Sequence, residues 1–230
     1  DNEWRAVFGP DTTRAEEHAG ALIVTDARLL ALPVRSFRGT FAWVTSPLLL
    51  TLARRDLASG ETLNVPPIDG RKALVTQSAA TVVGNKVYLE DLDLPASNGV
   101  SSIADWAALI GAVFGDDHEM FEKRFVVVDD ETMTFLWETA TQVDARVRID
   151  AETRTVAKRA LWLEESLPPE TLLIGVLLAD RSRKKDVKLD PDEVLAKAVP
   201  GAEVIQFGGK ATVGRGRCRL LPLGGKGTTL

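Results

Sequence analysis

The chain has 230 residues, 45% hydrophobic and 27% charged, a balance typical of a globular protein with a sizeable core. Its net charge of -5 argues against a uniformly basic nucleic-acid-binding surface but leaves room for a local basic track. The single cysteine excludes an internal disulfide, the two separated histidines give no zinc spacing, and no apolar run reaches the ~20 residues of a membrane span.

The amino-terminal quarter predicts strands followed by a helix. Residues 1–17 neither begin with Met nor resemble a signal peptide, and we expect further sequence upstream. Residues 20–37 are rich in Ile, Val and Leu but broken at Asp26, which predicts two short strands or one bent strand. Ser46 and Pro47 are typical of a helix start. The leucines expected on the buried face of this helix are Leu48, Leu49, Leu52 and Leu57.

The middle of the chain alternates between loop, strand and helix signals. Residues 59–85 contain prolines and glycines among polar residues and predict a loop-rich segment. Residues 86–94 alternate between apolar and polar side chains and predict one strand, and residues 123–130 predict another. Residues 101–115 and 130–140 are predicted to be helices. The chain's five tryptophans have apolar surroundings and are expected in the core rather than as stacking platforms for bases.

The carboxy-terminal part begins with a hairpin pattern. Residues 141–165 predict a β-hairpin, because apolar and polar side chains alternate along it up to a polar turn. Residues 170–180 predict one buried strand. Asp190 and Pro191 predict the start of a helix that ends before Gly201. Since strands and helices are mixed without a regular parallel alternation, we expect an α+β fold with a largely antiparallel sheet.

Residues 206–220, QFGGKATVGRGRCRL, combine four glycines with four cationic side chains. The stretch is not a Walker A motif, because Gly214 is followed by Arg215 and Gly216, and no helix start follows to make it a dinucleotide fingerprint. Glycines let a backbone approach a phosphate, successive N–H groups can form an anion nest, and Arg matches phosphate oxygens. The stretch indicates a polyanion site, with a floppy hairpin carrying solvated charges as the open alternative.

Other polar clusters give weaker signals. Glu164 and Glu165 are adjacent, and adjacent side chains of a strand point to opposite faces, so an acid/base pair is not favoured. Residues 116–119, DDHE, favour a charged helix start over a metal chelate. Residues 181–186, RSRKKD, favour a solvated loop over a phosphate contact. No Ser/His/Asp or Cys/His set for nucleophilic catalysis is legible.

Four stretches in a fixed order resemble one known family. They are VFGPDT, AGALIVTDARLLALPVRSFRGTFAWVTSPLLL, ARVRIDAETRTVAKRALWLEESLPPETLL and IQFGGKATVGRGRCRL. In this order the chain resembles the RAMP superfamily of CRISPR effector proteins, above all the repeated backbone subunit of type III-B (Cmr) complexes. PVRSFRGTFAWVTSP is the most specific element. The resemblance runs from about residue 7 to about residue 222, and residues 59–140 carry no matching motif.

The resemblance implies a modified RRM-like (ferredoxin-like) antiparallel palm with a β-hairpin thumb, in a single RAMP domain over residues 1–230. Residues 59–140 would be an insertion and helical part, 141–165 the thumb and 206–220 the glycine-rich loop. It also implies a cytoplasmic filament in which several copies lie along one guide (CRISPR) RNA. Its partners would be target RNA and other effector-complex subunits, without a membrane.

The same resemblance implies cleavage of target RNA at regular intervals with a divalent metal, Mg or Mn. The family's catalytic aspartate belongs to a loop expected upstream of this chain, so no catalytic residue is identified, and Asp26 is not assigned that role. Glu164 and Glu165 are candidates for an accessory contribution. The resemblance therefore supports RNA binding by this chain better than it supports cleavage.

The expected RNA contacts form a basic track on an acidic body, reading guide phosphates independently of sequence. They are Arg35, Ser36, Arg38, Gly39, Arg146, Arg148, Arg159, Gly208, Gly209, Lys210, Gly214, Arg215, Gly216 and Arg217. Three alternatives stay open. They are a non-catalytic RAMP or type III-A backbone subunit, a guide-processing RAMP endonuclease, which His18 and His118 support little, and an interaction module that binds no RNA.

Overall fold

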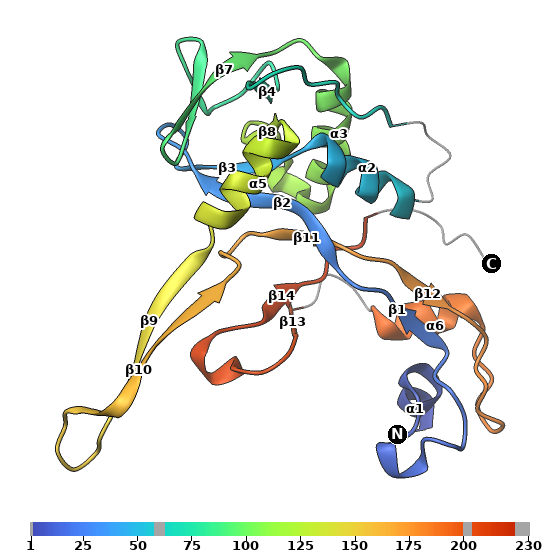
Figure 1. Cartoon of the computed structure of the whole chain (residues 1–230). Helices are drawn as coiled ribbons and strands as arrows, with labels where there is room; N and C mark the ends of the chain where they lie inside the picture. The colour runs from blue at the N-terminus through green and yellow to red at the C-terminus, as the bar shows by residue number, and fades with distance from the viewer. Residues whose placement is uncertain (1, 58–62, 200–203, 224–230) are drawn as a thin grey trace. The chain divides into compact units, whose positions relative to one another are not determined.

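The computed structural model describes residues 2–57, 63–199 and 204–223, and the chain folds into two compact units (Figure 1). The first unit comprises Asp1–Arg28, Asp56–Glu61 and Ile174–Leu230, and the second comprises Leu29–Arg55 and Thr62–Leu173. Strands and helices are mixed in both units. The predicted α+β class is therefore confirmed.

An eight-stranded mixed sheet organises the second unit, with the strand order β11-β2-β3-β8-β4-β7-β6-β5. The strands are β2 (Arg28–Arg35), β3 (Phe41–Thr45), β4 (Ala73–Val75), β5 (Val82–Val83), β6 (Lys86–Leu89), β7 (Leu92–Ser97), β8 (Phe125–Val128) and β11 (Leu172–Ile174). β3 pairs with β8 and β4 with β7 in parallel, whereas β2/β3, β4/β8, β5/β6 and β6/β7 are antiparallel. The sheet is mainly antiparallel, as predicted, with two parallel pairs added.

Helices cover both faces of this sheet. Alternate residues of β3 divide between the faces: Val44 belongs to one core cluster with Met133 and Leu136 of α5 (Asp130–Thr139). Trp43 points the other way and packs against Phe121 of α4 (His118–Glu122) at a ring distance of 5.1 Å. Because both faces are covered, β3 and β8 read as continuous apolar runs. Burying each such large side chain stabilises the fold by roughly 1.5–3 kcal/mol.

The helix α3 (Ser101–Gly111) has the buried face that its sequence predicts, since Ile103, Trp106, Ala107 and Ile110 are all buried. The helix α2 (Pro47–Asp56) differs from its prediction. Its fully buried residues are Leu50 and Ala53, whereas Leu48 is 54% exposed. The N–H of Leu48 donates to the Asp130 carboxylate (3.0 Å), which places Leu48 at the exposed helix start. Leucine content alone did not identify the inward face.

Three strand predictions need correction. The stretch 86–94 is not one strand but the β6–β7 hairpin, which turns at Glu90 with a φ of 48°. The predicted loop-rich segment 59–85 contributes β4, which is buried at every position. The predicted strand 170–180 divides into β11 and β12 (Leu177–Ala179), which join different sheets. Between the two strands, the N–H of Val176 donates a hydrogen bond to the hydroxyl of Thr25 (2.9 Å).

The first unit has a small core of its own. β1 (Leu22–Val24) pairs antiparallel with β12, so residues 20–37 form two strands, one of the two predicted outcomes. The helices α1 (Asn2–Phe8) and α6 (Pro191–Ala198) contribute Ala6, Val7 and Val194 to the buried cluster. Asp190 caps α6 as predicted, in a capping box with Glu193. The predicted helix stop at Gly201 lies outside the described residues.

Two further pairs of strands form separate two-stranded sheets. β9 (Gln142–Ile149) and β10 (Val156–Ser166) form a two-stranded hairpin that projects from the second unit (Figure 1). β13 (Val204–Gln206) and β14 (Arg217–Arg219) form another in the first unit, around the short 3-10 helix η3 (Ala211–Val213). Among the described residues, no helix has the length and apolarity required to cross a membrane. These two hairpins carry most of the predicted RNA contacts.

The prediction that the tryptophans lie in the core is correct for two of the five. Trp43 and Trp106 are fully buried, and their indole N–H groups donate to backbone carbonyls. Trp4, Trp137 and Trp162 are 57%, 42% and 45% exposed. Apolar sequence neighbours misled this prediction, because the neighbours of Trp162 on β10 are exposed themselves.

Candidate nucleic-acid interface

The β2–β3 turn, residues 36–40, contains three of the predicted RNA contacts. The N–H of Ser36 donates to the carbonyl of Thr40 (3.1 Å), and Gly39 and Thr40 have φ values of 81° and 74°. The N–H of Phe37 donates to the carbonyl of Tyr88 on β6 (3.2 Å). The turn is thus fixed by its own hydrogen bonds and by a neighbouring strand.

The two arginines of this region are held by partners far away in the sequence. Arg35 Nε lies 3.0 Å from Glu90 Oε2, and this contact raises the pKa of the Arg35 guanidinium above its ordinary value. Arg38 donates to the carbonyl of Val82 (2.9 Å). Ser36 is buried and its hydroxyl has no hydrogen-bond partner within the described parts of the chain. Arg35 and Arg38 therefore present cationic groups at the surface of this turn, and the half-buried Arg124 donates to the Gly39 carbonyl.

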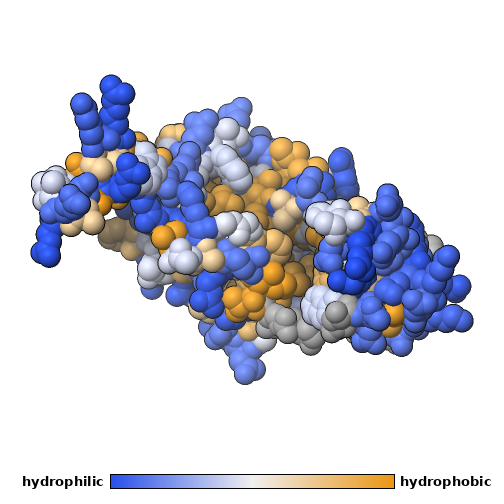
Figure 2. All heavy atoms as spheres, turned by 90° about the horizontal axis from the view of Figure 1, so that it is seen from below, coloured by the Kyte–Doolittle hydropathy of each residue, from blue (hydrophilic) through white to orange (hydrophobic). Residues whose placement is uncertain are grey.

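The β9–β10 hairpin has one apolar and one polar face. Its register pairs Val147 with Leu161, and Ala145 with Leu163, on the same face. The polar face carries the pairs Asp144/Glu164, Arg146/Trp162 and Gln142/Ser166. The predicted alternation of β9 is therefore confirmed, but Val143, Val147, Ile149, Leu161 and Leu163 are exposed rather than buried. Seen from below, long hydrophilic side chains surround the end of the projecting hairpin (Figure 2).

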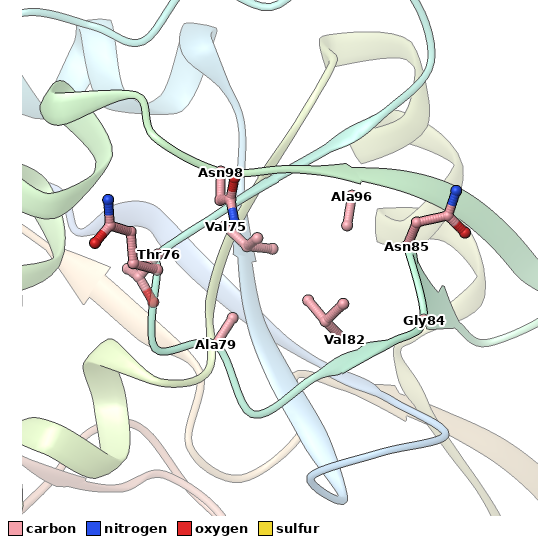
Figure 3. Close-up of a pocket in the computed structure, with 9 residues that line it drawn as sticks. Val75, Thr76, Ala79, Val82, Gly84, Asn85, Ala96 and Asn98 are labelled. Atoms are coloured by element: carbon pink, nitrogen blue, oxygen red, sulfur yellow. The ribbon is translucent and has the colours of Figure 1, made fainter.

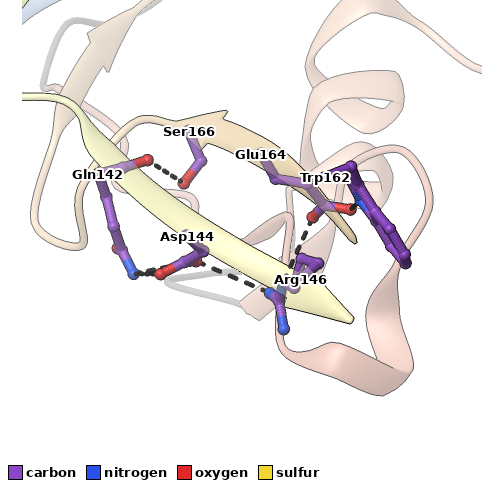
Figure 4. A network of polar contacts seen from close by, with 6 residues as sticks. All are labelled: Gln142, Asp144, Arg146, Trp162, Glu164 and Ser166. Carbon is purple, nitrogen blue, oxygen red and sulfur yellow. Dashed lines mark hydrogen bonds and ion pairs between the residues drawn. The ribbon is translucent and has the colours of Figure 1, made fainter. Parts of the chain in front are cut away.

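A network of polar contacts occupies the part of the hairpin nearest the sheet (Figure 4). Arg146 lies between Asp144, at 3.8 Å, and Glu164, at 3.6 Å. Glu164 also accepts a hydrogen bond from the indole N–H of Trp162 (2.8 Å). Arg146 was predicted to bind RNA, but two carboxylates oppose its charge in this arrangement. In this arrangement Arg146 joins the two strands of the hairpin through its contacts with Asp144 on β9 and Glu164 on β10.

The outer half of the hairpin has a different charge arrangement. Arg148 and Arg159 are exposed and form no ion pair among the residues described in the structure. Arg159 sits in the register shift between Val156 and Leu161, with a φ of 60°. Such a bulge re-aims side chains and increases local twist. The cations that can meet a polyanion on this hairpin are therefore those beyond Arg146.

An aspartate closes the hairpin turn. The Asp150 carboxylate accepts hydrogen bonds from the backbone N–H of Thr153 (2.8 Å), the Thr153 hydroxyl (3.0 Å) and the N–H of Glu152 (3.1 Å). These donors, the Thr153 N–H foremost, lower the pKa of Asp150 below its ordinary value of 3.8. The turn is therefore an Asx-type turn. The sequence DAET predicted a polar turn region but not this closure by Asp150.

The two adjacent glutamates are separated, as the sequence predicts. Glu165 accepts a hydrogen bond from the Thr141 hydroxyl (2.7 Å), whereas Glu164 belongs to the network on the other face. They do not form a carboxylate pair. Among residues 2–57, 63–199 and 204–223, no group of three or more His, Cys, Asp or Glu side chains is arranged to hold a metal ion.

The glycine loop, residues 206–217, is a closed turn built around an amide. Gln206 Nε2 lies 2.8 Å from the Arg215 carbonyl, and also within 3.5 Å of the carbonyls of Phe207, Gly208 and Gly209. Phe207 N–H donates to Gly216 O (2.8 Å). Gly208, Gly214 and Gly216 have φ between 66° and 77°, and a Cβ on Gly216 would lie 2.0 Å from Phe207 O. The closure therefore depends on Gly216 for space and on Gly208, Gly214 and Gly216 for their left-handed backbone conformation.

The cations of the glycine loop are arranged in two groups. Lys210 is exposed in a left-handed conformation, and Arg215 is half-buried. Arg217 and Arg219 are exposed on alternate positions of β14 and therefore share a face. The N–H groups of Phe207, Val213, Gly214 and Arg215 already donate to carbonyls. An anion nest formed by those four groups is therefore ruled out.

No RNA contact is assigned to the pocket of the second unit or to residues 181–186. A shallow pocket of about 250 Å³ in the second unit is lined by Val75, Val82, Ala96 and neighbouring neutral residues, with the amide of Asn85 turned outward (Figure 3). No charged side chain lines it. Within 181–186, Arg183 pairs with Asp180 (3.0 Å). Sequence reasoning missed Glu90, Phe37 and Gln206, whose roles depend on contacts that no local pattern signals.

A family model for the RAMP superfamily matches residues 5–219. The chain belongs to the RAMP superfamily. It is 37% identical over 216 residues to the CRISPR system Cmr endoribonuclease Cmr4 of Pyrococcus furiosus, covering 91% of this chain and 72% of that protein. It is 23% identical over 234 residues to the CRISPR system CMR subunit Cmr4 of Saccharolobus solfataricus, covering 91% of this chain and 73% of that subunit.

Solved structures of Cmr4 proteins have the same fold as this RAMP chain. Oligomeric Cmr4 from Pyrococcus furiosus superposes with a TM-score of 0.66 at 24% identity, covering 94% of this chain and 75% of that one. A chain of the type III-B Cmr-beta complex bound to cognate target RNA gives a TM-score of 0.65 at 19% identity, covering 94% and 74%. The resemblance inferred from sequence motifs is therefore confirmed at the level of family and fold.

Proposed function

We propose that this chain is a backbone subunit of a type III-B CRISPR effector complex. It binds guide RNA through phosphates, stacks with other copies of itself and with other subunits, and positions target RNA for cleavage at regular intervals. The observation that carries this proposal is the 37% identity to a Cmr endoribonuclease over 91% of the chain. The single free cysteine, Cys218, accords with a cytoplasmic location.

The finer fold assignment is part of the same proposal. The large sheet of the second unit corresponds to a modified RRM-like palm, and the β9–β10 hairpin to a thumb. The family match extends across both compact units, which supports one RAMP domain that includes the 59–140 insertion. An exposed two-stranded hairpin is marginally stable alone, and a duplex or a neighbouring subunit beside it would supply the contacts that its apolar face lacks.

The RNA contacts are proposed separately for each unit. In the first unit, Lys210, Arg215 and Arg217 meet guide phosphates where the glycine loop brings the main chain close. In the second unit, Arg35 and Arg38 of the β2–β3 turn and Arg148 and Arg159 of the hairpin do so. Arg219 shares the exposed face of Arg217 and joins this set. Sequence-independent binding follows, because phosphates carry no base identity.

Metal-dependent cleavage is proposed for the assembled complex, with Mg or Mn as the divalent ion. The described residues do not fit a resident metal site, since they contain no three-ligand cluster. We therefore assign no metal ligand in this chain. Glu164 is the accessory candidate, because Arg146 and Trp162 fix its carboxylate on the polar face of the hairpin. Glu165 belongs to the opposite face.

The proposal is tested by titrating the chain against labelled single-stranded RNA and DNA of equal length at several salt concentrations. The same series uses a variant with Lys210→Ala, Arg215→Ala and Arg217→Ala. Wild type should prefer RNA, and the variant should lower the salt slope by about 2, since each phosphate contact on a single strand contributes ~0.7. A matched variant with Arg14→Ala, Lys188→Ala and Lys197→Ala removes the same charge from exposed positions of the same unit.

Equal slopes for the two variants would show that only net charge matters and would contradict the assigned loop contacts. Reconstitution with guide RNA and the other subunits then tests the backbone role. Target RNA should be cut at regular intervals only when the chain and a divalent cation are both present. Cutting at one position, or none in the complete assembly, would contradict a repeated cleaving subunit.

A further inference from the structure

We propose that Phe37 is a stacking platform for an unpaired RNA base, held in place by Tyr88 and flanked by Arg35 and Arg38. This inference rests on the proposed RNA binding but concerns a base contact rather than a phosphate contact. It adds a residue that the sequence motif contains but that charge patterning overlooks.

Phe37 is the most exposed large apolar side chain in the described structure, at 83% of its surface. Exposed single hydrophobic residues are common and carry no meaning by themselves. Phe37 differs because the chain around it is fixed while the ring is left open. Its ring meets Tyr88 edge to face, with centroids 6.0 Å apart and planes at 62°. That contact orients the ring and leaves most of its surface to solvent.

Four hydrogen bonds hold the backbone near the ring. Phe37 N–H donates to Tyr88 O, and Ser36 N–H to Thr40 O. Arg124 Nε donates to Gly39 O (3.0 Å), although Arg124 is 85 residues away. The isolated bridge between Ser36 and Leu89 comprises the Phe37 N–H bond and a second bond from the N–H of Glu90 to Arg35 O (3.0 Å). A turn this constrained loses little entropy on binding, so a ligand gains the full contact with the ring.

The flanking cations fit the ligand class. Arg35 is pinned by Glu90 yet its side chain stays 86% exposed, and Arg38 is pinned by the carbonyl of Val82. An exposed aromatic ring that has positioned arginines two residues before it and one residue after it matches a nucleotide, whose base stacks and whose phosphate is anionic. Single-stranded RNA is the form in which bases are available for such stacking.

The experiment measures stacking directly with 2-aminopurine, whose fluorescence falls when the base stacks. Single-stranded RNAs carrying one 2-aminopurine at successive positions are bound to the full chain and to Phe37→Leu and Phe37→Trp variants. Wild type and Phe37→Trp should quench the probe. Phe37→Leu should lose the quenching and bind about 10-fold more weakly, as expected for one lost stacked base. Since Phe37 is 83% exposed, the variants should fold normally.

The controls separate the ring from general apolarity. Phe135→Leu changes another exposed phenylalanine of the same unit, 42% exposed on α5, and should leave binding and quenching unchanged. RNA with an abasic site at the quenched position should bind wild type and Phe37→Leu equally. Salt-dependent RNA binding by wild type that Phe37→Leu shares in full, with no loss of quenching, would overturn this inference and leave the proposed function intact.

Two other outcomes also decide against the platform. If wild type binds no RNA at any salt concentration, both this inference and the proposed function fail. If Phe37→Leu changes the sedimentation of the RNA-free chain and not the probe fluorescence, the ring belongs to a contact between copies. Tyr88→Leu is predicted to weaken quenching less than Phe37→Leu does, because Tyr88 positions the ring without being stacked itself.

Discussion

The β2–β3 turn and the glycine loop carry the same sequence signal, cationic side chains beside glycine, but the structure uses the cations differently. In the β2–β3 turn the arginines hold the turn: Arg35 pairs with Glu90, and Arg38 donates to a backbone carbonyl. In the glycine loop an uncharged side chain, Gln206, closes the turn. Arg217 is consequently left exposed on β14.

A glycine–cation pattern in the sequence therefore predicts a turn, but it does not indicate which cationic side chains stay available to bind a ligand. What decides this is the presence of a distant partner. Glu90 is 55 residues from Arg35 in the sequence and reaches it only because the β6–β7 hairpin turns there. Gln206 satisfies the carbonyls of its own loop, so no cation is required for that task. Changes that exchange or remove these closing contacts test the comparison.

The largest effect is expected from Gly216→Ala. The added Cβ would overlap Phe207 O at 2.0 Å, at a φ of 72° that L residues rarely adopt. The clash and the backbone strain together should destabilise the closed loop by about 3 kcal/mol or more. Amide hydrogen exchange of Phe207, whose N–H donates to Gly216 O, should accelerate strongly, and RNA affinity should fall at least about tenfold.

Gly209→Ala is the matched control for that change. A Cβ there meets nothing within 4 Å, and Gly209 is not among the residues with positive φ. The substitution should leave Phe207 exchange and RNA affinity nearly unchanged. Equal damage from Gly209→Ala and Gly216→Ala would mean that flexibility, rather than the closed turn, is what the glycines provide. The distinction between the two loops would then be lost.

The second prediction applies the same contrast within the β9–β10 hairpin. Arg148→Ala combined with Arg159→Ala removes two cations that form no ion pair among the described residues, and should lower the salt slope of RNA binding by about 1.4. Arg146→Ala should change the slope less, because Asp144 and Glu164 oppose the charge of Arg146. The measurement is the dependence of the association constant on salt for each variant. A larger slope change for Arg146→Ala would reverse the assignment.

The sequence allowed the fold class, the hairpin alternation, the α3 face and the α6 cap to be predicted, because each depends on residues close in the chain. It did not allow the division of residues 170–180 between two sheets, which depends on the pairing of β11 with β2 and of β12 with β1, both far earlier in the sequence. The candidate site followed the same rule. The cationic positions could be predicted from the sequence. The partners of Arg35 and Arg146 could not, because they depend on strand pairing. Phe37 was missed because the search for RNA contacts followed charged side chains.

The third prediction concerns the ion pair of the β2–β3 turn. Glu90→Gln removes the carboxylate that faces Arg35 and should strengthen RNA binding about two- to threefold at low salt, with the gain lost at high salt. The melting temperature should change little, since the Arg35 side chain is 86% exposed and Gln keeps an acceptor oxygen for it. Asp91→Asn alters the net charge equally at the neighbouring exposed position and should have a smaller effect. Equal gains from both variants would mean that Arg35 is not specifically neutralised by Glu90.

The smallest effect is expected at the hairpin turn, where an acid rather than a glycine or a cation closes the chain. Hydrogen bonds from Thr153 and Glu152 lower the pKa of Asp150, so the folded turn binds its proton less readily than the unfolded chain does. Its contribution to stability is therefore present above pH ~4 and is lost as the pH falls through the lowered pKa. NMR titration of the Asp150 carboxyl should give a midpoint below 3.8, with faster Thr153 amide exchange on the acid side. Asp150→Asn keeps an acceptor oxygen and should abolish this pH dependence while retaining most of the turn. A midpoint at or above the ordinary value would show that the carboxylate does not hold the turn, and that the register shift at Arg159 fixes the hairpin end without it.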